Sequence, residues 1–222
     1  MAVISRRAAT LGAASLLAGA AGIWTRMSHA KEELPPPGPT PVAQAVRVIF
    51  HVPVEAANVK GALTEAATNA SLVIAEKLLG VGFRRGADAS LPERFARLET
   101  RADRNELSSL LTAGSVDVFL VTSLRDVDDT RLHRRGVTWT HYRAPAAGGA
   151  RGPYIVLADS ASPSTLAHEL GHFFGLSHVQ ARNNLMSYDR EEGEEFLDEP
   201  QLRTVKQVST ARLRSKWLVG VP

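Results

Sequence analysis

The chain contains no cysteine among its 222 residues. This absence excludes disulfide bonds, thiolate metal ligands, a lipid-bearing cysteine and any latency device built on a cysteine. Acidic residues are missing from the first thirty positions, which hold three arginines. These three account for the whole formal charge of +3, so the rest of the chain balances its basic and acidic residues. The balance gives no reason to expect nucleic acid or an anionic membrane as the main partner.

The first thirty residues are typical of an export signal. Arg6 and Arg7 precede a weakly apolar run, residues 8–24, and Ser28-His29-Ala30 supplies the small residues that cleavage requires. The paired arginines resemble a bacterial twin-arginine signal. An uncleaved anchor is the alternative, because the run is just long enough to span a bilayer. Its alanines and glycines partition weakly into lipid, which favours cleavage, no stable membrane insertion afterwards, and a periplasmic or secreted location.

The sequence predicts three consecutive segments. Residues 1–30 form the signal peptide, and residues 31–41 form a proline-rich linker that is stiff and extended. Residues 42–222 form one folded domain, long enough to bury a sizeable core. Its hydrophobic content of 44% and charged content of 22% across the chain are ordinary for a globular protein.

Hydrophobic patterning predicts an α+β fold in which a twisted mixed β-sheet packs against several helices. The strand expected at 116–121 is apolar throughout, as in a central strand. The first helix is expected to bury Leu63, Ala66, Ala67, Ala70, Ile74 and Leu78, and the last Leu202, Val205, Val208 and Leu213. Strands are predicted at 46–54, 116–121, 137–142 and 154–157, and helices at 59–79, 103–112, from about 164, and 198–218.

Three of the seven histidines fall within one stretch, AHELGHFFGLSH. His168 and His172 are four residues apart, so a helix places both on one face, where they can share a metal ion. Gly175 can adopt the left-handed conformation that ends a helix, which lets His178 return as a third ligand. Glu169 points away from the pair and can take a proton from water at the metal. Three neutral nitrogens and one open position describe a catalytic Zn²⁺ site.

The alternative is that these are core or capping histidines that satisfy one another, but five residues at these spacings are rare by chance. The pattern HELGHFFGLSH resembles the zinc-binding consensus HExxHxxGxxH of the metzincin metallopeptidases. The downstream phrase NLMSY resembles their methionine-containing turn, in which Met186 would pack beneath the imidazoles without ligating the ion. The phrases GLSH and NLMSY favour a pappalysin-like or matrixin-like relative, whereas the short connection from His178 to Met186 departs from the pattern of many family members.

The resemblance implies a single catalytic domain that hydrolyses peptide bonds with Zn²⁺ as cofactor. Glu169 would be the general base, and Tyr188 would stabilise the oxyanion, as the tyrosine does at that position in astacins, serralysins and pappalysins. The strand at 152–158 would correspond to the metzincin edge strand and hold a protein or peptide substrate in extended form by backbone hydrogen bonds.

Two other functions compete with an exported endopeptidase. One is a non-catalytic, zinc-stabilised binding module, although such a module needs neither Glu169 nor Tyr188. The other is a peptidase directed at one specific protein partner. The acidic segment 189–195 could favour basic substrate residues but is better explained as a solvated loop. Oligomeric state is left open. The residues considered and set aside as ligands are Asp126, Asp128 and Asp129 for calcium, and His51, His133 and His141 for zinc.

Export can be tested by replacing Arg6 and Arg7 with lysine. The twin-arginine route reads the arginine pair itself, so we expect the double variant to stay in the cytoplasm as an uncleaved precursor while the parent chain is exported. Cell fractionation with immunoblotting measures both forms. Export of the lysine variant at the parental rate would contradict this route.

Overall fold

The computed structural model describes residues 44–140 and 152–222. The predicted signal peptide, the linker and the domain start at residue 42 lie outside the described residues, as do His141 and the end of the strand expected at 137–142. These assignments stay predictions. None of the helices in the described part of the chain has both the length and the apolar character needed to cross a bilayer.

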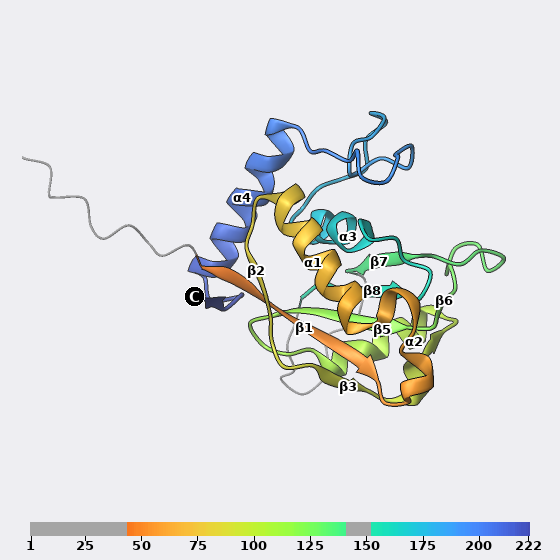
Figure 1. Cartoon of the computed structure of the whole chain (residues 1–222). Coiled ribbons are helices and arrows are strands. Elements are labelled where there is room, and N and C mark those ends of the chain that lie inside the picture. Colours follow the sequence, from red (N-terminus) through yellow and green to blue (C-terminus); the bar gives the residue numbers. More distant parts are fainter. Residues whose placement is uncertain (1–43, 141–151) are drawn as a thin grey trace, which may run out of the picture. The chain divides into compact units, whose positions relative to one another are not determined.

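The centre of the fold is a mixed sheet with the strand order β2-β1-β5-β8-β7, in which β3 and β9 also pair with β1 (Figure 1). β1 runs parallel to β2, β3 and β5, and β5 runs parallel to β8. β7 and β9 are antiparallel to their partners. The strands are β1 (Ala45–Pro53), β2 (Phe83–Arg85), β3 (Ala89–Leu91), β5 (Val116–Val121), β7 (Gly136–Trp139), β8 (Tyr154–Ala158) and β9 (Gly220–Val221), while β4 (Arg97–Leu98) and β6 (Ser123–Leu124) form a separate parallel pair.

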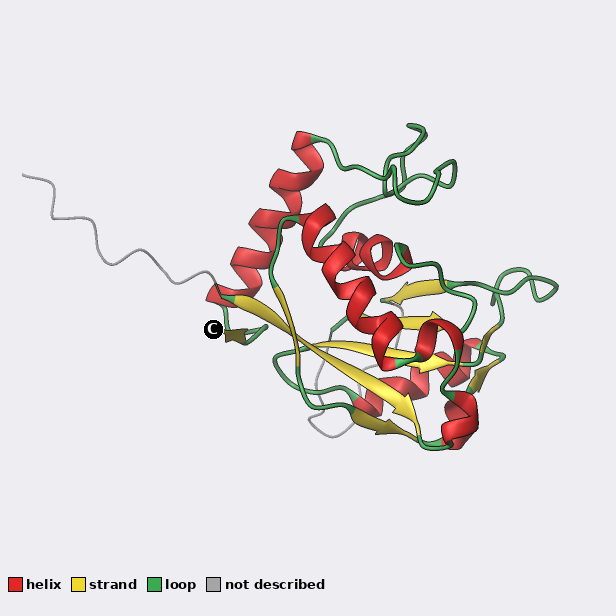
Figure 2. Cartoon of the chain, in the orientation of Figure 1, coloured by secondary structure: helices red, strands yellow, loops and turns green. Residues whose placement is uncertain are grey.

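Apolar side chains cover both faces of the sheet. Every residue of β5 and of β8 is buried, which explains why the 116–121 segment is apolar without alternation. Val118 and Leu120 of β5 belong to one core cluster, together with residues of α1, α3 and α4. Phe119 and Val121 point to the opposite face, where Leu107 is among the residues that cover them. Figure 2 shows helices on both sides of the strands. The predicted α+β mixed sheet is confirmed.

The first helix differs from its prediction in start and in face. α1 spans Glu65–Leu79, because the Thr64 side chain caps it, and two 3₁₀ turns take up much of the preceding stretch. Its buried face includes Leu72 and Leu79, whereas the predicted core residues Ala66 and Ala70 are exposed. Leucine side chains remove more apolar area from water than alanines do, so they set the rotation of the helix.

Of the other helices, α3 and α4 lie close to their predicted positions, whereas α2 is shorter than predicted. α2 is short, Arg101–Glu106, and continues as a 3₁₀ turn instead of one helix to residue 112. α3 spans Thr165–Phe173 and carries the histidine motif. α4 spans Glu199–Arg214 and begins with a capping box of Asp198 and Gln201. In α4 the predicted core residue Val205 is fully buried, whereas Leu202 is 36% exposed.

The strand that was expected at the edge of the sheet lies inside it. β8 pairs with β5 on one side and with β7 on the other, so the prediction that residues 152–158 form the edge strand is wrong. β7 ends the strand order instead, and no other described strand pairs with its second edge. Which strand is outermost depends on long-range pairing, which an apolar pattern does not report.

Arg212 holds the end of α4 against the end of α3. Its guanidinium lies 4.5 Å from the ring centroid of Trp217 and 4.6 Å from that of Phe173. Within the described residues it makes no ion pair with a carboxylate, and its buried Nη1 has no hydrogen-bond partner. The contacts are therefore cation–π and apolar packing, which need the long side chain as well as the charge.

Removing these contacts should destabilise the domain. We expect Arg212→Ala to lower the free energy of unfolding by about 2 kcal/mol, since a partly desolvated cation loses two aromatic faces. Arg214→Ala, on the exposed side of the same helix, is the matched control and should change stability by less than about 0.5 kcal/mol. Urea unfolding measures both. Equal stabilities of the two variants would contradict the role given to Arg212.

Candidate metal centre

The chain reverses direction at the end of α3. Gly175 adopts a φ of +94°, which a residue without Cβ reaches at little cost. Its N–H donates to the carbonyl of His172 at 2.9 Å and closes the helix end. The reversal agrees with the sequence-based prediction, and it returns His178 to the side of the two helical histidines, His168 and His172.

The ring nitrogens of the three histidines converge. Nε2 of His178 lies 3.0 Å from Nε2 of His172 and 3.3 Å from Nε2 of His168. Nδ1 of His168 faces the carbonyl oxygen of Leu185 at 2.7 Å, and Nδ1 of His172 faces that of Leu176 at 2.8 Å. Because a carbonyl oxygen only accepts hydrogen bonds, each of these Nδ1 atoms carries the proton and each matching Nε2 presents a lone pair. Nη1 of Arg190 also lies 3.3 Å from Nδ1 of His168, but the 2.7 Å contact with Leu185 is shorter and decides the tautomer.

This arrangement fits a Zn²⁺ ion. Converging lone pairs repel one another unless a cation lies among them, and tetrahedral zinc holds its nitrogen ligands about 3.3 Å apart. Burial lowers the pKa of His168 to about 4 and also lowers the pKa of His172 and of His178, so the imidazoles are neutral, as ligands must be. Within residues 44–140 and 152–222 it is the one His, Asp or Glu group with this geometry.

The turn around Met186 packs against α3, the helix that carries His168 and His172. Met186 is fully buried and packs against Gly171 of α3, where a Cβ would lie 2.6 Å from the methionine sulfur. Buried Asn184 clamps the turn: its Oδ1 accepts from the Met186 N–H at 2.9 Å, and its Nδ2 donates to Oε1 of Gln201 at 2.7 Å. These two hydrogen bonds hold the turn so that the Leu185 carbonyl faces Nδ1 of His168. Sequence reasoning identified the methionine but missed Asn184 and its partner in α4.

Glu169 is buried beside the ligands, with 5% of its surface exposed. The hydroxyl of Thr138 in β7 lies 2.9 Å from Oε2 of Glu169 and 2.6 Å from its carbonyl oxygen. Burial raises the pKa of the Glu169 carboxyl to about 7, although the Thr138 hydrogen bonds oppose the shift. Such a carboxyl can gain and lose a proton near neutral pH. Thr138 left no signal in the sequence, because its role depends on β7 lying against α3.

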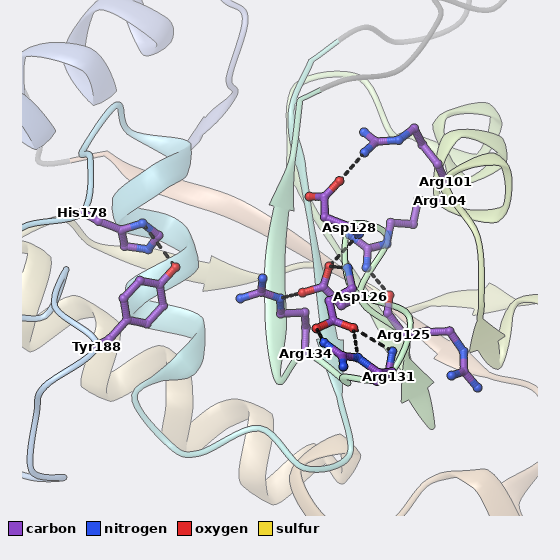
Figure 3. Close-up of polar contacts among 10 residues, drawn as sticks. Arg101, Arg104, Arg125, Asp126, Asp128, Arg131, Arg134, His178 and Tyr188 are labelled. Carbon is purple, nitrogen blue, oxygen red and sulfur yellow. Dashed lines mark hydrogen bonds and ion pairs between the residues drawn. The ribbon is translucent and has the colours of Figure 1, made fainter.

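Tyr188 lies at the mouth of the site and is 72% exposed. Its hydroxyl is 3.4 Å from Nδ1 of His178, and the two rings are 4.4 Å apart between centroids (Figure 3). The contact observed is therefore with a ligand histidine. The predicted contact with a substrate oxyanion stays a prediction.

Two cavities flank the metal centre, with volumes of about 350 and 440 Å³. The smaller one extends towards Ser162 and Arg190, and the larger one towards Trp139 and Asp126. Together they form a cleft along β7. The residues that line both cavities are Arg134, Gly136, His168, Glu169 and Tyr188.

Of the residues set aside in the sequence, His133 lines the smaller cavity, whereas His51 and the three aspartates have other partners. Buried His51 lies 2.7 Å from buried Asp117, far along the chain from the motif. The three aspartates considered for calcium each face a different arginine: Asp126 pairs with Arg134, Asp128 with Arg101, and Asp129 with Arg131. In the acidic segment, Glu191 pairs with Arg182, while Glu192 and Glu195 line the smaller cavity.

No protein-family model and no curated protein matches the chain. Among solved structures, archaemetzincin from Methanopyrus kandleri aligns with a TM-score of 0.51 and 15% identity over 80% of this chain and 99% of that one. Metalloproteinase-II from Bacteroides fragilis aligns with a TM-score of 0.49 and 16% identity over 77% of this chain, which spans only 55% of that protein. A zinc-dependent peptidase from Methanocorpusculum labreanum aligns with a TM-score of 0.44 and 10% identity, over 72% and 100% of the two chains. The similarity to the archaemetzincin shows a shared fold.

The reversal at the end of α3 can be tested with Gly175→Ala. A Cβ there meets no atom closer than 3.8 Å, so the cost of roughly 1–2 kcal/mol arises from the positive φ alone. Relief of that strain moves His178, and we expect weaker zinc binding. Gly193→Ala is the matched control, since Gly193 also has a positive φ of +88° and open space but lies outside the ligand set. Competition with a chromophoric chelator measures affinity, and equal zinc affinities in both variants would contradict the argument.

Proposed function

We propose that the protein is a zinc-dependent endopeptidase of the metzincin type. The single observation that carries the proposal is the convergence of three histidine nitrogens beside a buried carboxylate, in a cleft bordered by β7, the outermost of the described strands. The fold shared with an archaemetzincin supports it. Assignment to a pappalysin-like or matrixin-like subfamily rests on the short motifs alone, and export to the periplasm or exterior rests on residues 1–30.

His168, His172 and His178 would hold the Zn²⁺ ion. When bound, the ion polarises a carbonyl oxygen and makes water more acidic. Glu169 then acts as the general base: it accepts the proton of the attacking water and passes it to the amine that leaves. The Thr138 hydroxyl, 2.9 Å from Oε2, orients the carboxylate for both transfers. Tyr188 would donate to the oxyanion that forms on the substrate carbonyl.

In this proposal the substrate binds along the outer side of β7, with which no other described strand pairs. A peptide in extended form can pair with a strand edge through backbone hydrogen bonds, so recognition depends little on its sequence. β7 carries Thr138 and borders both cavities, which brings the peptide backbone past Glu169. This replaces the strand at 152–158 as the substrate-holding element.

A non-catalytic, zinc-stabilised binding module remains the second candidate. The open cleft with exposed Tyr188 would suit it equally well. The buried Glu169 argues against it, because taking a carboxylate out of water is costly and a structural zinc site has no use for one. A peptidase directed at a single protein partner would share the chemistry proposed here and differ only in substrate range.

Glu169→Gln separates the two functions. The variant should retain about one zinc per chain and lose turnover by at least about a hundredfold, since the amide cannot accept the proton. Metal analysis and digestion of a peptide library measure the two properties, and a chelator should abolish cleavage by the parent protein. Glu191→Gln, an exposed carboxylate paired with Arg182, is the control and should cut normally.

Cleavage by Glu169→Gln at the parental rate would show that the general base is wrongly assigned. If the parent and both variants hold zinc but none cleaves any peptide, the binding module is the better description.

A further inference from the structure

The loop between β6 and β7 is organised around one buried carboxylate. Asp126 is 3% exposed, and its Oδ1 accepts from the N–H groups of Asp128 at 2.8 Å and Asp129 at 3.2 Å. Its Oδ2 accepts from Nε of Arg134, which stands just before β7 (Figure 3). The loop therefore fixes both the backbone and the direction of one arginine side chain. None of this is required for the metal centre itself.

Arg134 presents the other side of its guanidinium to the cleft. Its side chain is 45% exposed, and within the described residues its Nη1 and Nη2 make no hydrogen bond. It lines both cavities, as Glu169 and Tyr188 do. In Figure 3 the guanidinium extends towards the side on which His178 and Tyr188 lie.

We propose that Arg134 contacts the substrate, with its Nη atoms donating to a backbone carbonyl oxygen next to the scissile bond, and that Asp126 is the residue that positions it. The inference rests on the proposed function and adds a binding residue to the same site. Arg134 stands where the two cavities meet, so any extended peptide that occupies both halves of the cleft passes it. A donor at that place meets the peptide backbone whatever the substrate side chains are.

The charges around Arg134 favour a neutral carbonyl over a carboxylate as its acceptor. Asp126 already neutralises the guanidinium, so Arg134 adds little net positive charge to the cleft. In the smaller cavity, Arg135 and Arg190 are balanced by Glu192 and Glu195. An ionised arginine that is paired on one edge remains a strong donor on its other edge, and its planar fork has fixed directions.

Arg134→Met tests the contact in the full-length, zinc-loaded protein. We expect kcat/KM to fall about tenfold or more for every peptide that the parent cleaves, because a hydrogen bond from a charged donor is lost. Arg131→Met is the matched control: Arg131 is on the same loop, pairs with Asp129, is 87% exposed and lines neither cavity. It should change kcat/KM by less than about twofold.

A matched peptide pair distinguishes the two possible acceptors. Two peptides that differ only in carrying Glu or Gln near the cleaved bond should show the same fold-decrease in kcat/KM when Arg134 is replaced by methionine. A loss confined to the Glu peptides would overturn the carbonyl assignment in favour of a carboxylate. An unchanged kcat/KM for both would overturn the contact altogether.

Binding provides a readout that does not need turnover. A fluorescent peptide titrated into zinc-loaded Glu169→Gln protein should bind about tenfold more weakly when Arg134→Met is added. If the parent protein binds the peptide but never cleaves it, the proposed endopeptidase activity is refuted. The effect of Arg134→Met on peptide affinity then still decides whether Arg134 contacts the peptide. A parent that cleaves, with binding indifferent to Arg134→Met, would refute the contact alone. A parent that neither binds nor cleaves would refute both.

A double-mutant cycle tests Asp126 as the positioning residue. Asp126→Asn should weaken peptide binding in the presence of Arg134 and have little further effect in the Arg134→Met background, because the two residues act as one unit. If the two losses add, Asp126 supports the loop only and the positioning role is overturned. Should Asp126→Asn fail to fold, Arg134→Lys replaces it: lysine lacks the Nε contact and the fork, so it should bind the peptide as weakly as methionine does.

Discussion

The structure depends on two hydrogen bonds from imidazole to backbone. The carbonyls of Leu185 and Leu176 accept hydrogen bonds from Nδ1 of His168 and of His172. The Nε2 lone pairs of these two histidines therefore converge with Nε2 of His178. Backbone carbonyls cannot donate, so the tautomer of each helical histidine is determined by the fold.

The rest of the fold brings those two carbonyls into place. Asn184 stabilises the turn that carries Leu185 by accepting a hydrogen bond from the Met186 N–H. Asn184 itself donates a hydrogen bond to Gln201 of α4. The end of α4 is packed by Arg212 against the aromatic residues at the end of α3. The C-terminal helix is thus coupled to the metal ligands through buried polar contacts at one end and cation–π contacts at the other. Both connections join segments that are distant in the sequence.

The sheet decides which groups border the metal centre. Because β7 is the outermost of the described strands, it borders the cleft, and its Thr138 contacts Glu169. The sequence indicated a mixed sheet with helices, and the observed bounds of β1, β5, β8, α3 and α4 lie close to the predicted ones. It misplaced the edge strand and the buried face of α1, since both depend on which distant segments come together.

The sequence by itself determined the ligand set. Spacings of four residues on a helix, a glycine at its end and a histidine three residues later are local features, and the 3.6-residue period converts them directly into geometry. Only the tertiary structure decided which groups lie around those histidines. Thr138 contacts Glu169, Asn184 holds the turn whose Leu185 carbonyl faces His168, and Asp126 holds Arg134 at the cleft. These contacts join residues that are far apart along the chain or lie in an irregular loop. Long-range packing, which no periodicity encodes, therefore determines how the site is oriented and what it can bind.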